Sequence, residues 1–69
     1  MLTIWVNEQL DPGGLMHACI ASCNERMARE CHESFKQHLT EEQKQLGWIA
    51  SLRTVTSWEQ VPVNSLNLG

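Results

Sequence analysis

Residues 15–39 read LMHACIASCNERMARECHESFKQHL, which is over a third of the chain, and they contain neither proline nor glycine. Apolar residues recur in this stretch every three or four positions, which is the period of an α-helix. They are Met16, Ile20, Cys23, Met27, Cys31, Phe35 and Leu39. The stretch therefore predicts one long amphipathic helix over residues 14–39.

The opposite side of this predicted helix carries charges of both signs. Three pairs of opposite charge are spaced four residues apart: Glu25 with Arg29, Arg26 with Glu30, and Arg29 with Glu33. Each such pair stabilises a helix by about 0.2–0.5 kcal/mol. Because the signs are mixed, we interpret this side as a solvated surface.

A second helix is predicted over residues 41–53. Thr40 and Gln43 have the spacing of a capping box, which marks a helix start. The apolar residues that follow are Leu46, Trp48, Ile49, Leu52 and Val55. Gly47 weakens this helix by about 1 kcal/mol relative to alanine. With only Thr40 between the two helices, we expect an α-helical hairpin.

Extended or irregular segments flank the hairpin in this interpretation. Asp11-Pro12-Gly13-Gly14 breaks regular structure, and residues 2–6 before it favour an extended N-terminal arm. The C-terminal segment after Arg53 is predicted to be irregular. The sequence thus predicts a single all-α domain. The alternative is a small α+β domain in which residues 2–6 pair with residues 54–58.

The predicted hairpin leaves part of its apolar stripe uncovered. A helix of about 25 residues is about 37 Å long, and the second helix covers only half of it. Two-fold dimers are the commonest oligomers of soluble proteins. We therefore expect a homodimer in which two hairpins form a dimeric bundle. Its self-association residues would be Met16, Ile20, Cys23, Met27 and Phe35.

Composition argues against several classes of function. The formal net charge is -3, with 5 basic side chains, whereas nucleic-acid binders concentrate positive charge. No apolar run reaches the roughly 20 residues of a membrane span. The N-terminus lacks the basic region of a secretion signal, and three cysteines are an odd count for a disulfide framework. We expect a cytoplasmic protein that binds neither nucleic acid nor membrane.

Cys19, Cys23, Cys31 and His17 are the candidate metal ligands. All four lie on one predicted helix, and a single helix cannot surround a tetrahedral ion. Free cysteine usually behaves as a small buried apolar residue, which is the interpretation we favour here. We therefore expect no metal and no cofactor. A metal- or redox-responsive regulator that uses these cysteines is the alternative.

Catalysis is not expected from this sequence. Cys31 and His32 are neighbours, and consecutive helical side chains point about 100° apart, so they do not face each other. A reactive cysteine also requires an activated and partly exposed thiol, whereas Cys31 lies on the apolar stripe. We expect a protein that is not an enzyme.

The remaining functional candidates are residues that commonly anchor protein interfaces. Interfaces are enriched in tryptophan and arginine, which selects Trp5, Arg53 and Trp58. The sequence therefore predicts a small protein-binding module, an adaptor or inhibitor that docks on a larger protein. Small phage-encoded inhibitors have a similar composition. A small DNA-binding regulator is a further alternative, although a helix–turn–helix over residues 39–61 has only Lys44 and Arg53 to contact phosphates.

Overall fold

The computed structural model describes residues 2–68 of the chain, which form an α+β fold. The elements in order are β1 (Ile4–Leu10), β2 (Met16–Ser22), α1 (Glu25–His38), α2 (Glu41–Leu46), β3 (Ile49–Val55), the 3₁₀ turn η1 (Trp58–Gln60) and β4 (Leu66–Asn67). The four strands form one sheet in the order β3-β1-β2-β4. β1 is antiparallel to both β2 and β3, whereas β4 is parallel to β2.

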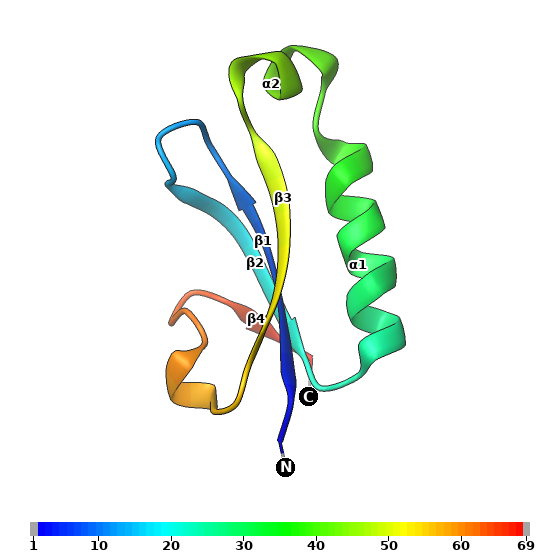
Figure 1. Ribbon diagram of the computed structural model, residues 1–69, viewed down its shortest axis with the longest axis vertical. Coiled ribbons are helices and arrows are strands. Elements are labelled where there is room, and N and C mark those ends of the chain that lie inside the picture. Colours follow the sequence, from blue (N-terminus) through cyan, green and yellow to red (C-terminus); the bar gives the residue numbers. More distant parts are fainter. Residues whose placement is uncertain (1, 69) are drawn as a thin grey trace.

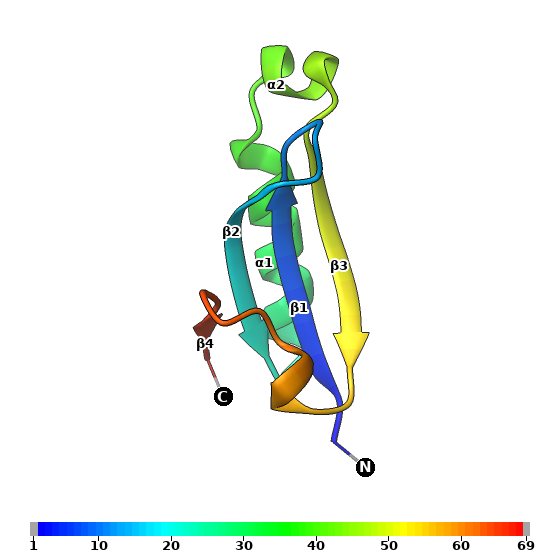
Figure 2. The same cartoon turned by 90° about the vertical axis from the view of Figure 1, so that its left-hand side faces the viewer.

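The sheet is the middle of three layers (Figures 1 and 2). α1 covers one face, and the segment that carries η1 and β4 crosses the other face. The molecule is long and thin, with extents of 39 × 22 × 16 Å. The β1–β2 hairpin loop and α2 lie together at one end of the long axis, and η1 lies toward the other end (Figure 1).

The main apolar cluster lies on the sheet face away from α1. Strand residues alternate between faces, so Ile4 and Val6 of β1 point to the same side. The cluster consists of Ile4, Val6, Cys19, Ala21, Val55 and Val61. Val61 comes from the segment after η1, which shows that the C-terminal segment covers this core. The irregular C-terminal segment predicted from sequence is therefore a structural layer.

The face toward α1 is held by amides as well as by apolar contacts. The Nδ2 group of Asn7 donates to the carbonyl oxygen of Ala28 at 2.9 Å. The Nε2 group of Gln9 donates to the carbonyl oxygen of Phe35 at 3.0 Å. Ala28 and Phe35 are buried on α1. Because the two bonds are two helical turns apart, they fix both the position and the rotation of α1 on β1.

The prediction of a helix over residues 14–39 is wrong in its first part. Residues Met16–Ser22 form β2, and α1 begins only at Glu25. Asn24 is the N-cap, and its side chain accepts from the backbone N–H of Met27. The error has a physical origin, because β2 packs on both faces, so its apolar residues do not alternate as in a half-exposed strand. A short apolar run of this kind does not separate strand from helix.

The prediction of a helix over residues 41–53 is correct only at its start. The capping box of Thr40 and Gln43 is present, and α2 spans Glu41–Leu46. Gly47 then ends the helix in the left-handed conformation, with φ 104°. Glycine adopts this conformation without the strain that a side chain adds. The predicted second half of the helix is instead β3, which pairs with β1 along its whole length.

The all-α fold and its helical hairpin are therefore wrong, and with them the dimeric bundle built from hairpins. The predicted self-association residues do not form one helical stripe, since Met16 and Ile20 lie on β2 whereas Met27 and Phe35 lie on α1. The extended N-terminal arm is the central strand β1. The α+β alternative is the fold class observed, and its pairing of residues 2–6 with 54–58 is realised by Ile4 opposite Val55.

Candidate functional site: an apolar tip at the hairpin loop

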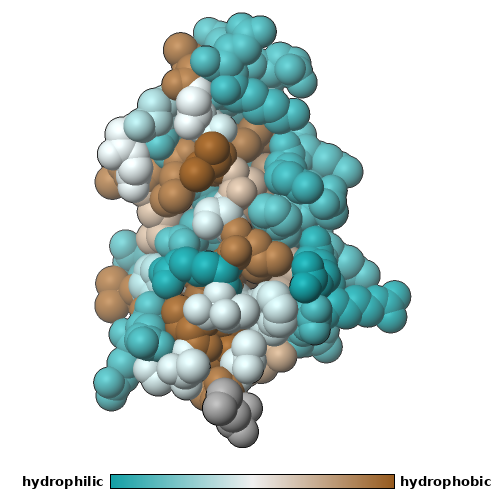
Figure 3. All heavy atoms as spheres, viewed as in Figure 1, coloured by the Kyte–Doolittle hydropathy of each residue, from teal (hydrophilic) through white to brown (hydrophobic). Residues whose placement is uncertain are grey.

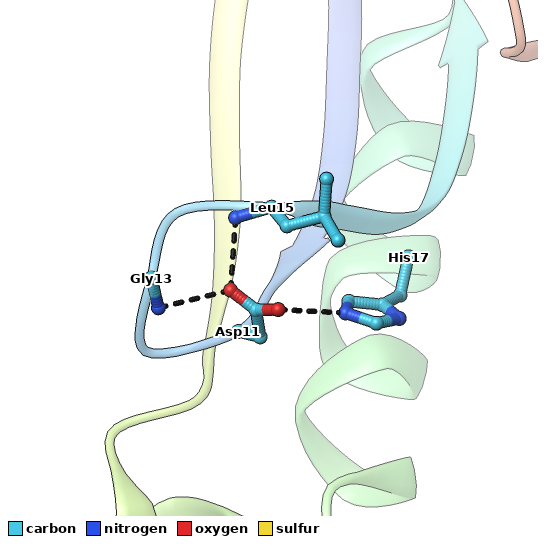
Figure 4. Close-up of polar contacts among 4 residues, drawn as sticks. All are labelled: Asp11, Gly13, Leu15 and His17. Carbon is cyan, nitrogen blue, oxygen red and sulfur yellow. Dashed lines mark hydrogen bonds and ion pairs between the residues drawn. The ribbon is translucent and has the colours of Figure 1, made fainter.

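Asp11 organises the loop between β1 and β2 (Figure 4). One carboxylate oxygen, Oδ1, accepts the backbone N–H groups of Gly13 and Leu15, each at 2.9 Å. The backbone N–H of Gly14 donates to the carbonyl of Asp11 at 2.9 Å, and Gly14 has φ 86°. The sequence Asp-Pro-Gly-Gly is thus a turn that reverses the chain between two strands.

The other oxygen of Asp11, Oδ2, lies 3.0 Å from Nε2 of His17. An irregularity in the ladder puts His17 in this place, because Gln9 pairs with Ala18 while Leu10 pairs with Met16. The extra residue is His17, as in a β-bulge. The hydrogen bond from His17, followed by that from Leu15, holds the pKa of Asp11 below its usual 3.8. The loop is therefore closed by an acid–imidazole pair.

The loop is also fixed to the junction between α2 and β3. The ring of His17 packs against that of Trp48, with centroids 4.5 Å apart. Gly47 lies beside Pro12, and a methyl group on Gly47 would be in ordinary van der Waals contact with Pro12 Cβ, at 3.5 Å. Two segments separated by 28 residues of sequence, residues 18–45, thus form one rigid end of the molecule, which we call the tip: residues 11–17 and 46–49.

The tip exposes apolar side chains. Leu15 is 64% exposed, Leu46 is 62% exposed and Ile49 is 54% exposed. Figure 3 shows apolar atoms gathered where the hairpin loop, α2 and the start of β3 meet. Exposed apolar surface that is held on a rigid frame is typical of protein interaction sites.

The C-terminal segment exposes apolar residues too, among them Val63 and Leu66. They differ from the tip in their support, because β4 has only two residues. The tip combines exposed apolar side chains with a turn that three side-chain hydrogen bonds and a ring contact hold in shape. It is therefore the better-defined candidate.

The three predicted anchor residues do not share one surface. Trp5 is half-buried on the face toward α1, where the guanidinium of Arg29 lies 5.2 Å from its ring centroid. Arg53 lies on the opposite face, where its Nε donates to Oε1 of the buried Glu8 at 2.8 Å. This bond raises the pKa of Arg53. Trp58 is 39% exposed in η1. Their roles in partner binding stay predictions.

The candidate metal ligands are dispersed. Cys19 is buried in the core, Cys31 is half-buried on α1 and Cys23 is exposed before it. Within residues 2–68 no three His, Cys, Asp or Glu side chains come together as they would around a metal ion. Burial raises the pKa of Cys31, and burial followed by the charge of Glu8 raises the pKa of Cys19. Both cysteines therefore favour the protonated thiol over the thiolate, which is the form that reacts and binds metal.

The elements that the helix–turn–helix alternative requires are not formed by residues 39–61. Between Leu39 and Val61 the structure has α2, β3 and η1, so no second helix stands where a recognition helix would. Lys44 is bound to Glu41 at 3.5 Å, and Arg53 is bound to Glu8. No helix in the described residues has the length and apolarity that crossing a membrane requires.

Comparison of the chain with protein-family models, with curated proteins and with solved structures finds no match.

Sequence reasoning missed the tip, although two signals for it were present. Asp-Pro-Gly-Gly between two apolar stretches is the pattern of a strand–turn–strand hairpin. Gly47, six residues after the helix start at Glu41, is the pattern of a C-cap. The contact of His17 with Trp48 had no local signal, because it depends on the pairing of β1 with β3.

Proposed function

We propose that this chain is a non-enzymatic protein-binding module that docks its apolar tip on a larger protein. The observation that carries the proposal is the exposure of Leu15, Leu46 and Ile49 on a frame fixed by Asp11 and His17. A preorganised surface loses little side-chain and loop entropy on binding, so more of the apolar burial appears as affinity. The partner surface would be an apolar groove that receives these side chains.

The role of adaptor or inhibitor follows from size. At 7.9 kDa the chain is small beside most partners, and its tip is narrow because the molecule is only 22 × 16 Å across its long axis. A narrow end that carries three aliphatic side chains fits into a groove on the partner protein. As an inhibitor it would exclude other proteins from that groove, and as an adaptor it would link the partner to a second protein. Half-buried Trp48, whose ring packs against that of His17, supplies a rigid aromatic support within the tip.

The test compares two double variants that remove equal kinds of side chain. Leu15→Ser with Leu46→Ser alters the tip, whereas Val63→Ser with Leu66→Ser alters the exposed C-terminal segment. Both pairs replace exposed aliphatic residues without changing charge. Tagged wild-type protein and both variants are used to capture partners from the same cells, and the affinity of each captured protein is then measured in purified form.

We expect the tip variant to bind its partner at least tenfold more weakly, a loss of about 1.4 kcal/mol, while the control variant binds as the wild type does. Circular dichroism and the unfolding midpoint show whether both variants remain folded. Equal binding by the two variants, or a loss confined to the C-terminal variant, would remove the tip as the docking surface.

A further inference from the structure

The two edges of the sheet differ in how far another segment of the chain pairs with their backbone groups. The edge formed by β2 is covered at one end by β4, where Leu66 pairs with Ile20 and Asn67 pairs with Ala21. The backbone N–H of Leu68 adds a bond to the carbonyl of Ala21 at 2.8 Å. β3 forms the other edge and has a neighbouring strand on one side only. Figure 2 shows no segment beside β3 on the side away from β1.

β3 also has few of the features that protect an edge strand from pairing, since its one charged residue, Arg53, is bound to Glu8 of the same chain. All seven residues pair with β1 in one continuous register, so no bulge twists the strand away. Its sequence IASLRTV contains no proline, no lysine and no acidic residue. In the described part of the chain its backbone groups bond only to β1. A regular edge of seven residues with so little protection is a template for a further strand.

We propose that this further strand is β3 of a second copy of the chain. The two β3 strands pair antiparallel about a two-fold axis perpendicular to the sheet, with Leu52 opposite its own counterpart. The four-stranded sheets then join into one sheet of eight strands, and both α1 helices lie on the same face. The docking tip and this edge share only Ile49, the first residue of β3, and the pairing is argued from the strand edge alone, so the inference does not depend on the proposed function.

The register follows from the symmetry and the strand length. Opposing residues in an antiparallel pair point to the same face of the sheet. With a two-fold axis perpendicular to the sheet, this condition is met only by registers that place one residue opposite its own counterpart. Among these, only the register centred on Leu52 pairs all seven residues of β3. A shift by two positions toward either end leaves two residues of each strand without a partner, which removes backbone hydrogen bonds.

The side chains are complementary in this register. Arg53 lies opposite Ser51, Thr54 opposite Ala50, and Val55 opposite Ile49. The register centred on Arg53 would instead place two arginines directly opposite each other, which is destabilising. Arg53 is already held by Glu8 of its own chain, so the interface takes up no unpaired charge. The complementarity of β3 with itself is the argument for a second copy as the occupant.

The rest of the molecule leaves room for this pairing. α1 lies behind the middle of the sheet and does not extend past β3 (Figure 2). A further strand would lie about 4.8 Å from β3, and no other backbone segment is drawn beside β3 on the side away from β1. Ile49 of one copy meets Val55 of the other, so the two tips point to opposite ends of the dimer. Such a dimer presents two docking surfaces.

The mass of the purified full chain in solution is the first test. Sedimentation equilibrium over a range of concentrations is expected to give twice the chain mass of 7.9 kDa, with a shift toward the monomer on dilution. A mass of 7.9 kDa at every concentration up to the solubility limit would overturn the inference. It would leave the docking of the tip untouched, because Ile49 is the only residue of the tip that lies in the β3 interface and docking does not require the dimer.

The register is tested by cross-linking in a background that removes the exposed native thiol, Cys23→Ser. Opposing residues of an antiparallel pair have Cα atoms about 4.5–5.5 Å apart, which is within disulfide range. Leu52→Cys is therefore expected to form a covalent dimer when oxidised glutathione is added, with two thiols oxidised and glutathione reduced. Thr54→Cys is the matched control, because its two copies would be roughly 14 Å apart.

The expected result is a covalent dimer of the Leu52→Cys variant and little or none of the Thr54→Cys variant. Equal cross-linking of both variants would indicate random collision, and cross-linking of the Thr54→Cys variant alone would indicate another register. Either result would overturn the proposed pairing. Circular dichroism of both variants checks that the sheet is intact.

Discussion

Asp11 carries more of the tip geometry than any other single side chain in the described residues. It accepts two backbone N–H groups with one oxygen and binds His17 with the other. These bonds stabilise the ionised carboxylate, which is why its pKa lies below 3.8. The same bonds make the shape of the tip depend on the charge state of one residue.

Asp11→Asn tests this dependence. The lowered pKa means that ionised Asp11 stabilises the folded state above its unfolded pKa of about 3.8, and that this contribution is lost as pH falls through the lower folded pKa. We expect the wild type to exceed the variant in free energy of unfolding at pH 6. The difference should shrink as the pH drops below 3.8.

Urea unfolding at several pH values measures this difference. Glu42→Gln makes the same charge change on exposed α2, where Glu42 has no ion-pair partner among the described residues. A pH-independent difference between wild type and Asp11→Asn, or an equal dependence in Glu42→Gln, would contradict the role assigned to Asp11.

Asn7 raises a different question, because it is only 1% exposed and its Oδ1 atom has no hydrogen-bond partner among the described residues. Its Nδ2 bond to Ala28 fixes the placement of α1. We infer that Asn7 contributes more to the position of the helix than to net stability, since an unpaired buried oxygen opposes folding.

Two substitutions of Asn7 separate these effects. Asn7→Ala leaves a cavity and should lower the free energy of unfolding by about 2 kcal/mol. Asn7→Leu fills the site and removes the unpaired oxygen, so its free energy of unfolding should lie within about 1 kcal/mol of the wild type. Chemical unfolding measures both. A Leu variant as unstable as the Ala variant would show that the amide is essential to stability.

At the level of elements, sequence predicted the second half of the long helix and failed on the first. Residues 25–38 are helical, and the predicted ion pairs Arg26–Glu30 and Arg29–Glu25 are confirmed at 3.2 and 2.9 Å. Glu33 instead binds Lys36, at 2.7 Å. β2 was predicted as part of the helix because Cys19 and Ala21 pack on one face of the sheet while Ile20 faces the other, so apolar residues occur on both faces. Such a strand has no alternating pattern.

β3 was assigned to a helix because its residues follow a genuine capping box. Thr40 and Gln43 start α2 as predicted, and the apolar residues after Gly47 continue a helical spacing. Gly47 decides the outcome. With φ 104° it ends the helix and turns the chain into β3, and the local pattern alone does not distinguish this from a weak point within a helix.

Gly47→Ala and Gly13→Ala form a matched test of this role. Alanine is strained at the positive φ of Gly47, so we expect a loss of about 1 kcal/mol in the free energy of unfolding. The contact with Pro12, at 3.5 Å, is ordinary and adds little. Gly13 has no such φ and only an ordinary contact with Asp11, so Gly13→Ala should change stability by less than about 0.5 kcal/mol.

Thermal and urea unfolding of both alanine variants give the comparison. Equal effects at the two glycines, or a larger loss at Gly13, would contradict the assignment of Gly47 as the residue that terminates α2.

At the scale of the whole molecule, the tip and the β3 edge both arise from contacts distant in sequence. Leu10 pairs with Ile49, and this pairing brings the hairpin loop to the α2–β3 junction. No local pattern in residues 11–17 indicates that Trp48 will lie against His17. The composition did favour a binding protein over an enzyme, and that interpretation stays a prediction. The place of binding required the topology of the sheet.

Amide hydrogen exchange at two protein concentrations tests the account of both surfaces most directly. At high concentration the β3 amides that point away from β1 should become protected, and at low concentration they should exchange quickly. The loop amides of Gly13 and Gly14, which donate to Asp11 in either state, should exchange at the same rate at both concentrations, because the loop stays free in the dimer. Fast exchange of those β3 amides at every concentration, or protection that appears at the loop instead, would contradict the account.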